Sequence, residues 1–213
     1  MIAALLLASA PIASAVDADI AFARDAKRIG QWSAFRKWAD SDAVMFTPQA
    51  VWAKTFLKSL KNPPGSISWR PTQSFVSCDG RTAVNTGPWF TQDSRLAGYF
   101  TTVWQKSAAG WRWVYDGGIP ATAKGAGRST LRIRSASCTG SALGAPIKAP
   151  PKLSPKQSVT SPQDNGRGES ADKTLGWDWK VTSGGERTLH VYLWTGGRYS
   201  EVIHAITPAP KSK

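Results

Sequence analysis

The chain has 213 residues, of which 41% are hydrophobic and 19% are charged. This balance is typical of a folded globular protein and excludes a disordered or collagen-like one. The net charge is +13, and +7 of it falls in residues 118–168, a stretch rich in Pro, Ala, Ser and Gly. Such a basic linker binds polyanions only weakly, so no specific nucleic-acid partner is expected.

The first 15 residues resemble an export signal. Residues 2–7 form an uncharged apolar run, and Ala13-Ser14-Ala15 has the small-x-small form of a signal peptidase site. We therefore predict cleavage after Ala15 and a periplasmic or secreted protein. The alternative is a buried N-terminal helix. No segment of the sequence contains 18 consecutive apolar residues, so no membrane span is predicted.

The chain contains two cysteines, Cys78 and Cys138, which belong to no C-x-x-C pair. Metal binding by these thiols is therefore not expected. In an oxidising compartment they are predicted to form a disulfide, the alternative being two free buried thiols.

Apolar residues first recur at helical spacing. Ala18–Ile29 and Trp32–Trp38 are predicted to be helices, and Gly30 separates them. A short strand is expected at Ala43–Thr47. A third helix is predicted at Ala50–Leu60, where Trp52, Phe56 and Leu60 recur every four residues.

From Ser66 the apolar period changes to two, which indicates strands. Four are predicted: Ile67–Val76, which Pro71 interrupts, Arg81–Phe90, Gly98–Lys106 and Trp111–Asp116. Both faces of these strands are partly apolar, so both must be covered. Helices followed by an antiparallel sheet predict an α+β fold with a cleft at its open end.

The C-terminal third is predicted to hold a linker and a small sheet. Residues 119–169 are expected to be a linker, with one short edge strand at Leu131–Arg134. Residues 170–206 are predicted to form a three-stranded β meander, and 207–213 a tail. Because three strands alone are marginally stable, the meander must dock on the first domain or on a partner.

Residues 16–118 are expected to form one domain, and residues 18–118 resemble the nuclear transport factor 2-like superfamily, in its SnoaL-like and ketosteroid-isomerase-like branch. The resemblance rests on residues 22–30, 31–35, 39–48, 98–104 and 110–114. It implies a cone-shaped α+β barrel that encloses a pocket, often in a homodimer.

The catalytic groups of the isomerases do not carry over to this sequence. The positions that correspond to their base, their oxyanion-hole tyrosine and their protonated aspartate are Thr47, Ala23 and a site near Phe100. Proton abstraction beside a carbonyl requires a base and an oxyanion donor. Isomerase chemistry of that type is therefore not expected.

Asp116 is the remaining candidate for pocket chemistry, because it ends an aromatic strand at the expected mouth of the barrel. Tyr99 is its candidate acid–base partner, and Tyr99, Trp104, Trp113 and Asp116 are the predicted pocket residues. Asp116 before Gly117-Gly118 also fits a turn. No cofactor motif or metal-ligand spacing is present, so no cofactor and no metal site are predicted.

Three functions remain open. The first is an exported domain that binds a small hydrophobic ligand, or acts as a scaffold, without catalysis. The second is an isomerase or hydrolase that uses Asp116. The third is a module that binds a cell-envelope polymer or protein through the meander, where Trp177, Trp179, Tyr192 and Trp194 would form an aromatic surface unless they fill the core.

Overall fold

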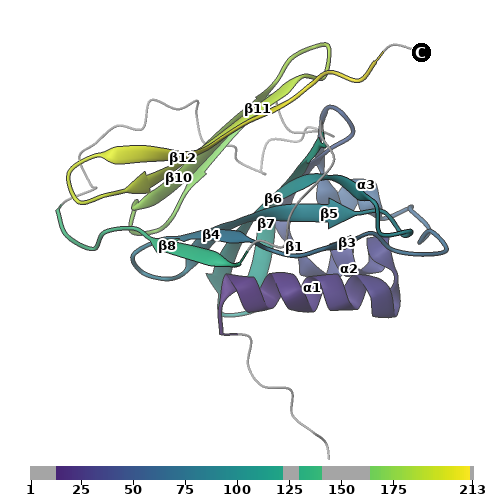
Figure 1. The fold of residues 1–213 in the computed structure, drawn as a ribbon, viewed down its shortest axis with the longest axis horizontal. Coiled ribbons are helices and arrows are strands. Elements are labelled where there is room, and N and C mark those ends of the chain that lie inside the picture. The colour runs from purple at the N-terminus through teal and green to yellow at the C-terminus, as the bar shows by residue number, and fades with distance from the viewer. Residues whose placement is uncertain (1–12, 122–129, 141–163, 212–213) are drawn as a thin grey trace, which may run out of the picture.

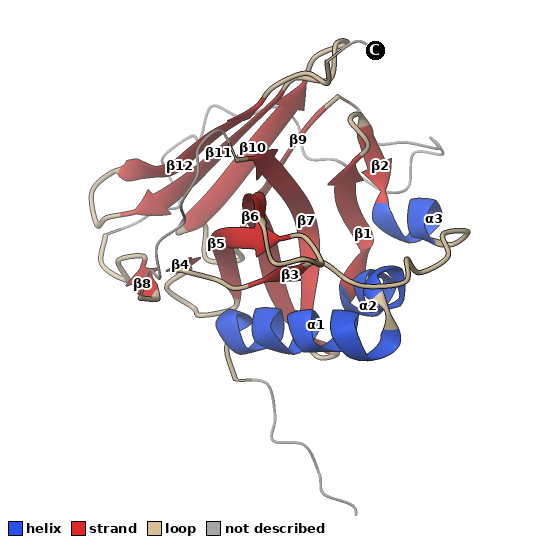
Figure 2. Cartoon of the chain, turned by 45° about the vertical axis from the view of Figure 1, so that its right-hand side comes forward, coloured by secondary structure: helices blue, strands red, loops and turns tan. Residues whose placement is uncertain are grey.

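The protein folds into three layers in a computed structural model that describes residues 13–121, 130–140 and 164–211. Helices cover one face of an eight-stranded sheet, and a four-stranded antiparallel sheet covers the other face (Figures 1 and 2). The predicted α+β class, with helices first and a small antiparallel sheet last, is confirmed.

Two helices open the fold: α1 (Ala15–Ile29) and α2 (Gln31–Trp38). Ser14 and Asp17 form a capping box at the start of α1, which satisfies backbone N–H groups that the helix leaves unpaired. Gly30 separates the helices at a φ of +93°, a conformation that favours glycine.

The large sheet has the order β2-β1-β7-β6-β5-β4-β8, with β3 paired to β5. Most neighbours are antiparallel, but β1 lies parallel to β7 and β4 parallel to β8. Pro71 separates β3 from β4, as the sequence predicts. The strands are β1 (Ala39–Phe46), β2 (Ala50–Trp52), β3 (Ser68–Trp69), β4 (Gln73–Val76), β5 (Thr82–Phe90), β6 (Leu96–Ser107), β7 (Gly110–Pro120) and β8 (Arg132–Ser135).

The third helix, predicted at Ala50–Leu60, is wrong at both ends. Ala50–Trp52 pairs with β1 as strand β2, and only Ala53–Leu57 is helical, as α3. Trp52 packs in the core between the two sheets, whereas Phe56 and Leu60 pack in the core beneath the helices. The recurrence of Trp52, Phe56 and Leu60 every four residues therefore does not mark one face of a single helix.

The small sheet contains four strands instead of the predicted three. β10 (Leu175–Val181), β11 (Arg187–Trp194) and β12 (Tyr199–Thr207) form the meander, and β9 (Asn165–Glu169) pairs with β10. β9 escapes the hydrophobic pattern because glycine faces the tryptophans of β10. A Cβ at Gly168 would lie 2.1 Å from the Trp177 ring, so only glycine fits there.

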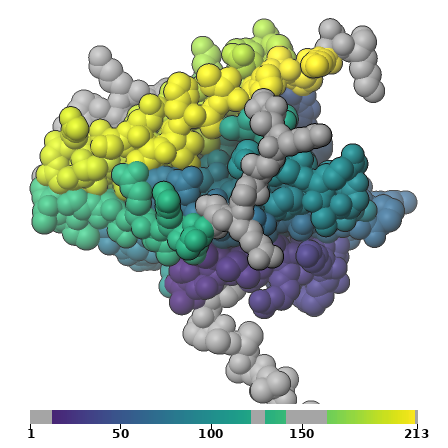
Figure 3. Space-filling model, viewed as in Figure 1, coloured from purple at the N-terminus to yellow at the C-terminus, as the bar shows by residue number. Residues whose placement is uncertain are grey.

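Two apolar cores hold the layers together. Between the helices and the sheet, Phe22, Phe35 and Trp38 pack against Trp104 and Trp113. The second core lies between the two sheets, and Figure 3 shows the C-terminal strands lying along the large sheet. It joins Val44, Phe75, Val84, Val103 and Tyr115 to Leu175, Trp177, Trp179, Val191 and Leu193.

The meander therefore docks on the first domain, and this removes the predicted aromatic surface. Trp177, Trp179 and Trp194 are buried in the core between the sheets. Only Tyr192, on the opposite face of β11, remains partly accessible. These three tryptophans therefore fill the core and form no exposed aromatic surface, and burial of their large apolar area stabilises the docked arrangement.

The predicted linker contributes ordered structure at both ends. β7 extends to Pro120, β8 forms the predicted edge strand, and β9 ends at Glu169. The disulfide between Cys78 and Cys138 is confirmed, with Cα atoms 5.2 Å apart. Residues 122–129 and 141–163 lie outside the described residues.

Most of the predicted export signal, residues 1–12, also lies outside the described residues. In the part that is described, cleavage after Ala15 would remove Ser14, the N-cap of α1. Among the described residues, no helix combines the length and the hydropathy needed to cross a membrane.

Replacing both cysteines should destabilise the protein strongly. The disulfide closes a loop of 60 residues, for which the loss of chain entropy predicts about 4 kcal/mol. We expect Cys78→Ser/Cys138→Ser to lower the free energy of urea unfolding by roughly this amount. Reductant should destabilise the wild type and leave the double variant unchanged. A double variant as stable as the oxidised wild type would contradict the prediction.

Candidate functional site: an aromatic cavity beside two buried carboxyl groups

A cavity of about 390 Å³ lies between the helices and the large sheet. Its walls are mostly aromatic or aliphatic, because the apolar faces of α1 and α2 meet the sheet without filling the space between them. The side chains on its wall are Phe22, Gln31, Trp32, Phe35, Met45, Phe46, Ile67, Trp69, Trp89, Phe100, Thr102 and Asp116.

Among the residues that the structure describes, Asp116 is the one carboxyl group on this wall. It lies on β7 directly opposite Thr102 of β6, and the Thr102 hydroxyl donates to its carboxylate at 2.7 Å. Burial raises the pKa of Asp116 to about 6, against the opposing effects of the Thr102 hydrogen bond and the positive charge of Arg187. Asp116 can therefore exchange a proton near neutral pH.

Asp19 is a second buried carboxyl group, and sequence reasoning missed it. It is fully buried on α1 and accepts hydrogen bonds from Trp69 Nε1 and Asn85 Nδ2, at 2.8 and 2.9 Å, and from Trp104 Nε1 at 3.3 Å. Burial raises its pKa to about 7, and the negative charge of Asp116 contributes, although the three donors lower it. Trp69 also lines the cavity and so connects Asp19 to the site.

The sequence does contain a signal for Asp19. It stands three residues before Phe22 and seven before Ala26, which places it on the apolar face of the predicted helix. A carboxyl group at such a position must be buried with hydrogen-bond donors around it. The donors come from β3, β5 and β6, so only the tertiary structure identifies them.

A second cavity of about 600 Å³ adjoins the first. Asp116, Met45, Phe46 and Trp89 line both, so Asp116 stands between them. Arg187 of β11 lies on the wall of the second cavity and donates to the Gly118 carbonyl at 2.7 Å. Its guanidinium also lies 4.2 Å from the centre of the Phe46 ring. The small sheet thus supplies a buried cation beside the site.

Of the four predicted pocket residues, only Asp116 lines the cavity. Trp104 and Trp113 are completely buried in the core beneath it. Tyr99 is 41% exposed, because alternation along β6 places it on the face opposite Phe100 and Thr102. The structure therefore does not bring the predicted pair of Asp116 and Tyr99 together.

The positions that correspond to the isomerase catalytic groups hold no acid or base. Phe100 is on the cavity wall, while Thr47 and Ala23 are not among the residues that line it. The described ionisable groups on the walls of the two cavities are instead Asp116, Arg187 and Lys211, with Asp19 behind Trp69. The described residues also bring His190, Glu201 and His204 together on β11 and β12 as potential metal ligands. None of them lines this cavity, and the sequence analysis predicted no metal site.

Comparison with known proteins gives little further information. No protein-family model and no curated protein matches the chain. A solved structure of a putative aromatic ring hydroxylase from Novosphingobium aromaticivorans is similar at 14% sequence identity and a TM-score of 0.35. The similarity covers 49% of this chain and 84% of that one. A similarity at this level supports no inference about function.

The buried Asp19 should make stability depend on pH. Its pKa is raised from about 3.8 to about 7. Between pH 4 and pH 7 Asp19 is therefore protonated in the folded state and ionised in the unfolded state. The free energy of unfolding should therefore fall as pH rises from 4 to 7, by on the order of 4 kcal/mol, and level off above pH 7.

Asp19→Asn should remove most of the slope above about pH 6 in urea unfolding followed by tryptophan fluorescence. Below pH 6 part of the slope should remain, because the pKa of Asp116 is also raised, to about 6. The carboxyl groups with lowered pKa values, such as Asp25 and Asp172, lose their stabilising effect only at more acidic pH. The exposed Asp42→Asn is the matched control and should keep the slope of the wild type. A D19N profile parallel to that of the wild type between pH 4 and 7 would show the prediction to be wrong.

Proposed function

We propose that this chain is an exported small-molecule-binding protein whose ligand occupies the inner cavity. The observation that carries the proposal is an aromatic cavity of about 390 Å³ with one carboxyl group on its wall. Pockets for small molecules are typically of this size, mostly apolar, with few polar groups that orient the ligand.

The chemistry of the wall defines the ligand class. Phe22, Phe35 and Phe100 favour a flat aromatic or alicyclic body, because ring faces and edges pack well against one another. Asp116 favours a ligand N–H or O–H group at one end. The charge of Arg187 in the adjoining cavity would attract a polar or anionic group that extends past Asp116.

We also propose membership of the nuclear transport factor 2-like superfamily, with its cone-shaped sheet. Support comes from helices that precede the sheet and cover one face, and from the parallel pairing of β1 with β7 beside the β1–β2 hairpin. Export is supported by the apolar N-terminal run and the disulfide, since disulfides persist in oxidising compartments. Homodimer formation stays a prediction.

A second candidate function is acid–base catalysis by Asp116 in an isomerase or hydrolase. It is favoured by the raised pKa of a carboxyl group that faces a cavity, which permits proton transfer near pH 6. The test is a screen for a substrate that the wild type converts. Loss of turnover in Asp116→Asn with substrate affinity retained would favour this function over binding alone, and turnover that survives D116N would exclude Asp116 as the acid–base group.

The binding proposal is tested with N-phenyl-1-naphthylamine, a neutral aromatic amine whose fluorescence rises in apolar surroundings. We expect saturable binding of one probe per chain. Ile67→Trp should narrow the cavity and weaken binding by at least about tenfold, since occupied volume excludes the probe. Asp116→Ala should weaken it by roughly fivefold, the value of one hydrogen bond.

Ile206→Trp is the matched control, because Ile206 is 53% exposed on β12 and does not line the inner cavity. Its affinity should equal that of the wild type. Absence of saturable binding, or equal affinities in the wild type and both cavity variants, would overturn the proposed binding site.

A further inference from the structure

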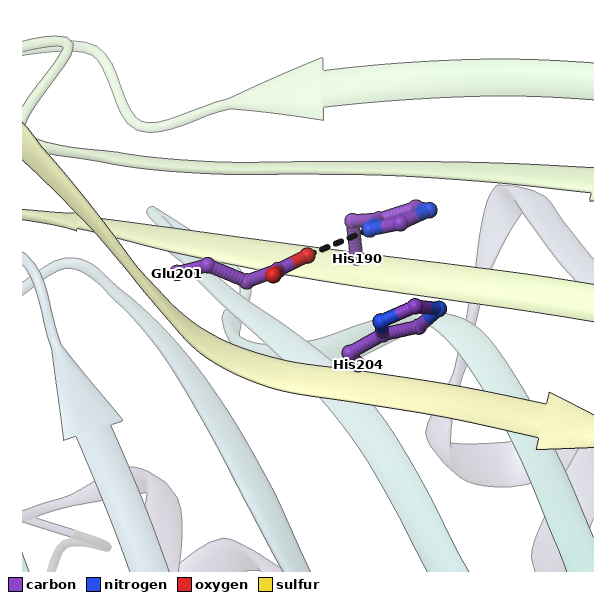
Figure 4. A group of neighbouring side chains, drawn as sticks. All are labelled: His190, Glu201 and His204. Carbon is purple, nitrogen blue, oxygen red and sulfur yellow. Dashed lines mark hydrogen bonds and ion pairs between the residues drawn. The ribbon is translucent and has the colours of Figure 1, made fainter.

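The outer face of the small sheet carries a cluster of three side chains that can ligate a metal ion. His190 comes from β11, and Glu201 and His204 come from β12 (Figure 4). One ligand atom from each lies within 4.8 Å of the other two. This face points away from the core between the sheets, so the cluster is independent of the cavity and of the proposed function.

A break in strand register brings the three side chains to one face. His190 pairs with His204 and Tyr192 pairs with Glu201, so Val202 has no partner residue on β11. In a regular strand, residues 201 and 204 would point to opposite faces, because side chains alternate. The bulge changes this parity and places Glu201 beside both histidines.

Contacts already hold the ligands close together. The Glu201 carboxylate binds Nδ1 of His190, and the His190 and His204 rings stack with their centres 4.5 Å apart. Asp178 of β10 lies directly opposite His190 and adds a second carboxyl group next to the cluster. Two carboxyl groups beside two imidazoles form a local environment that favours a bound cation.

The donor set identifies the class of ion. Two imidazole nitrogens and one carboxylate oxygen suit Zn²⁺ and related divalent transition metals, whereas Mg²⁺ and Ca²⁺ prefer oxygen ligands alone. Three protein ligands leave a coordination position free, and His204 and Glu201 are exposed, so that position faces solvent. Zinc–ligand bonds of about 2.0–2.2 Å require the ligand atoms to close in slightly, which exposed side chains can do by rotation.

We propose that His190, Glu201 and His204 bind one zinc-class divalent metal ion, with a coordination position open to an external ligand. The composition makes the proposal sharply testable. These are the only two histidines of the chain, and both cysteines are in the disulfide. Imidazole or thiolate binding at any other place in this chain is therefore excluded.

The experiment is a Zn²⁺ titration of the oxidised protein, without a histidine tag, by calorimetry with a competing chelator. We expect one ion per chain. His204→Ala and Glu201→Gln should each weaken binding by on the order of tenfold or more, because each removes a ligand. Glu186→Gln, an exposed carboxylate in the turn before β11, is the matched control and should bind like the wild type.

A second readout uses the wild type alone. Substoichiometric Co²⁺, which is paramagnetic, should selectively shift or broaden the ring-proton resonances of both histidines, and excess Mg²⁺ should not reverse the effect. Lack of saturable Zn²⁺ binding up to millimolar concentration would overturn the proposal. So would unchanged histidine resonances, or equal Zn²⁺ affinity in E201Q, H204A and the wild type.

Discussion

The structure depends on a central sheet that is apolar on both faces. Trp104 and Trp113 point toward the helices, while Val103 and Tyr115 point toward the small sheet. A sheet of this kind cannot face water on either side, so the helices cover one face and the small sheet covers the other. The three-layer arrangement, the buried tryptophans and the cavity between helices and sheet all follow from this constraint.

The position of the cavity follows from incomplete filling of one of these two interfaces. The core between the sheets contains large buried rings, including Trp177 and Trp179. Beneath the helices, side chains of α1, α2 and the large sheet leave a cavity whose wall includes Asp116. The burial that stabilises the fold also removes water from Asp116 and Asp19, and this raises the pKa of both carboxyl groups.

The small sheet uses its two faces in different ways. Its inner face completes the core and delivers Arg187 to the edge of the cavity. Its outer face bears the histidine and glutamate cluster, which a single bulge in β12 assembles. A sheet attached by one face is free to carry polar chemistry on the other, since outward side chains do not affect the packing of the core.

The sequence by itself determined the α+β class and the period of the main strands. It predicted the disulfide and four pocket residues, of which only Asp116 lines the cavity. These are local patterns, because spacing along one element sets which side chains share a face. Only the tertiary structure decided the split of residues 50–57 into a strand and a helix, and the glycine-rich β9. It alone brought donors to Asp19 and paired His190 with His204. Each of these depends on contacts between distant strands, and no single segment contains the information that fixes register.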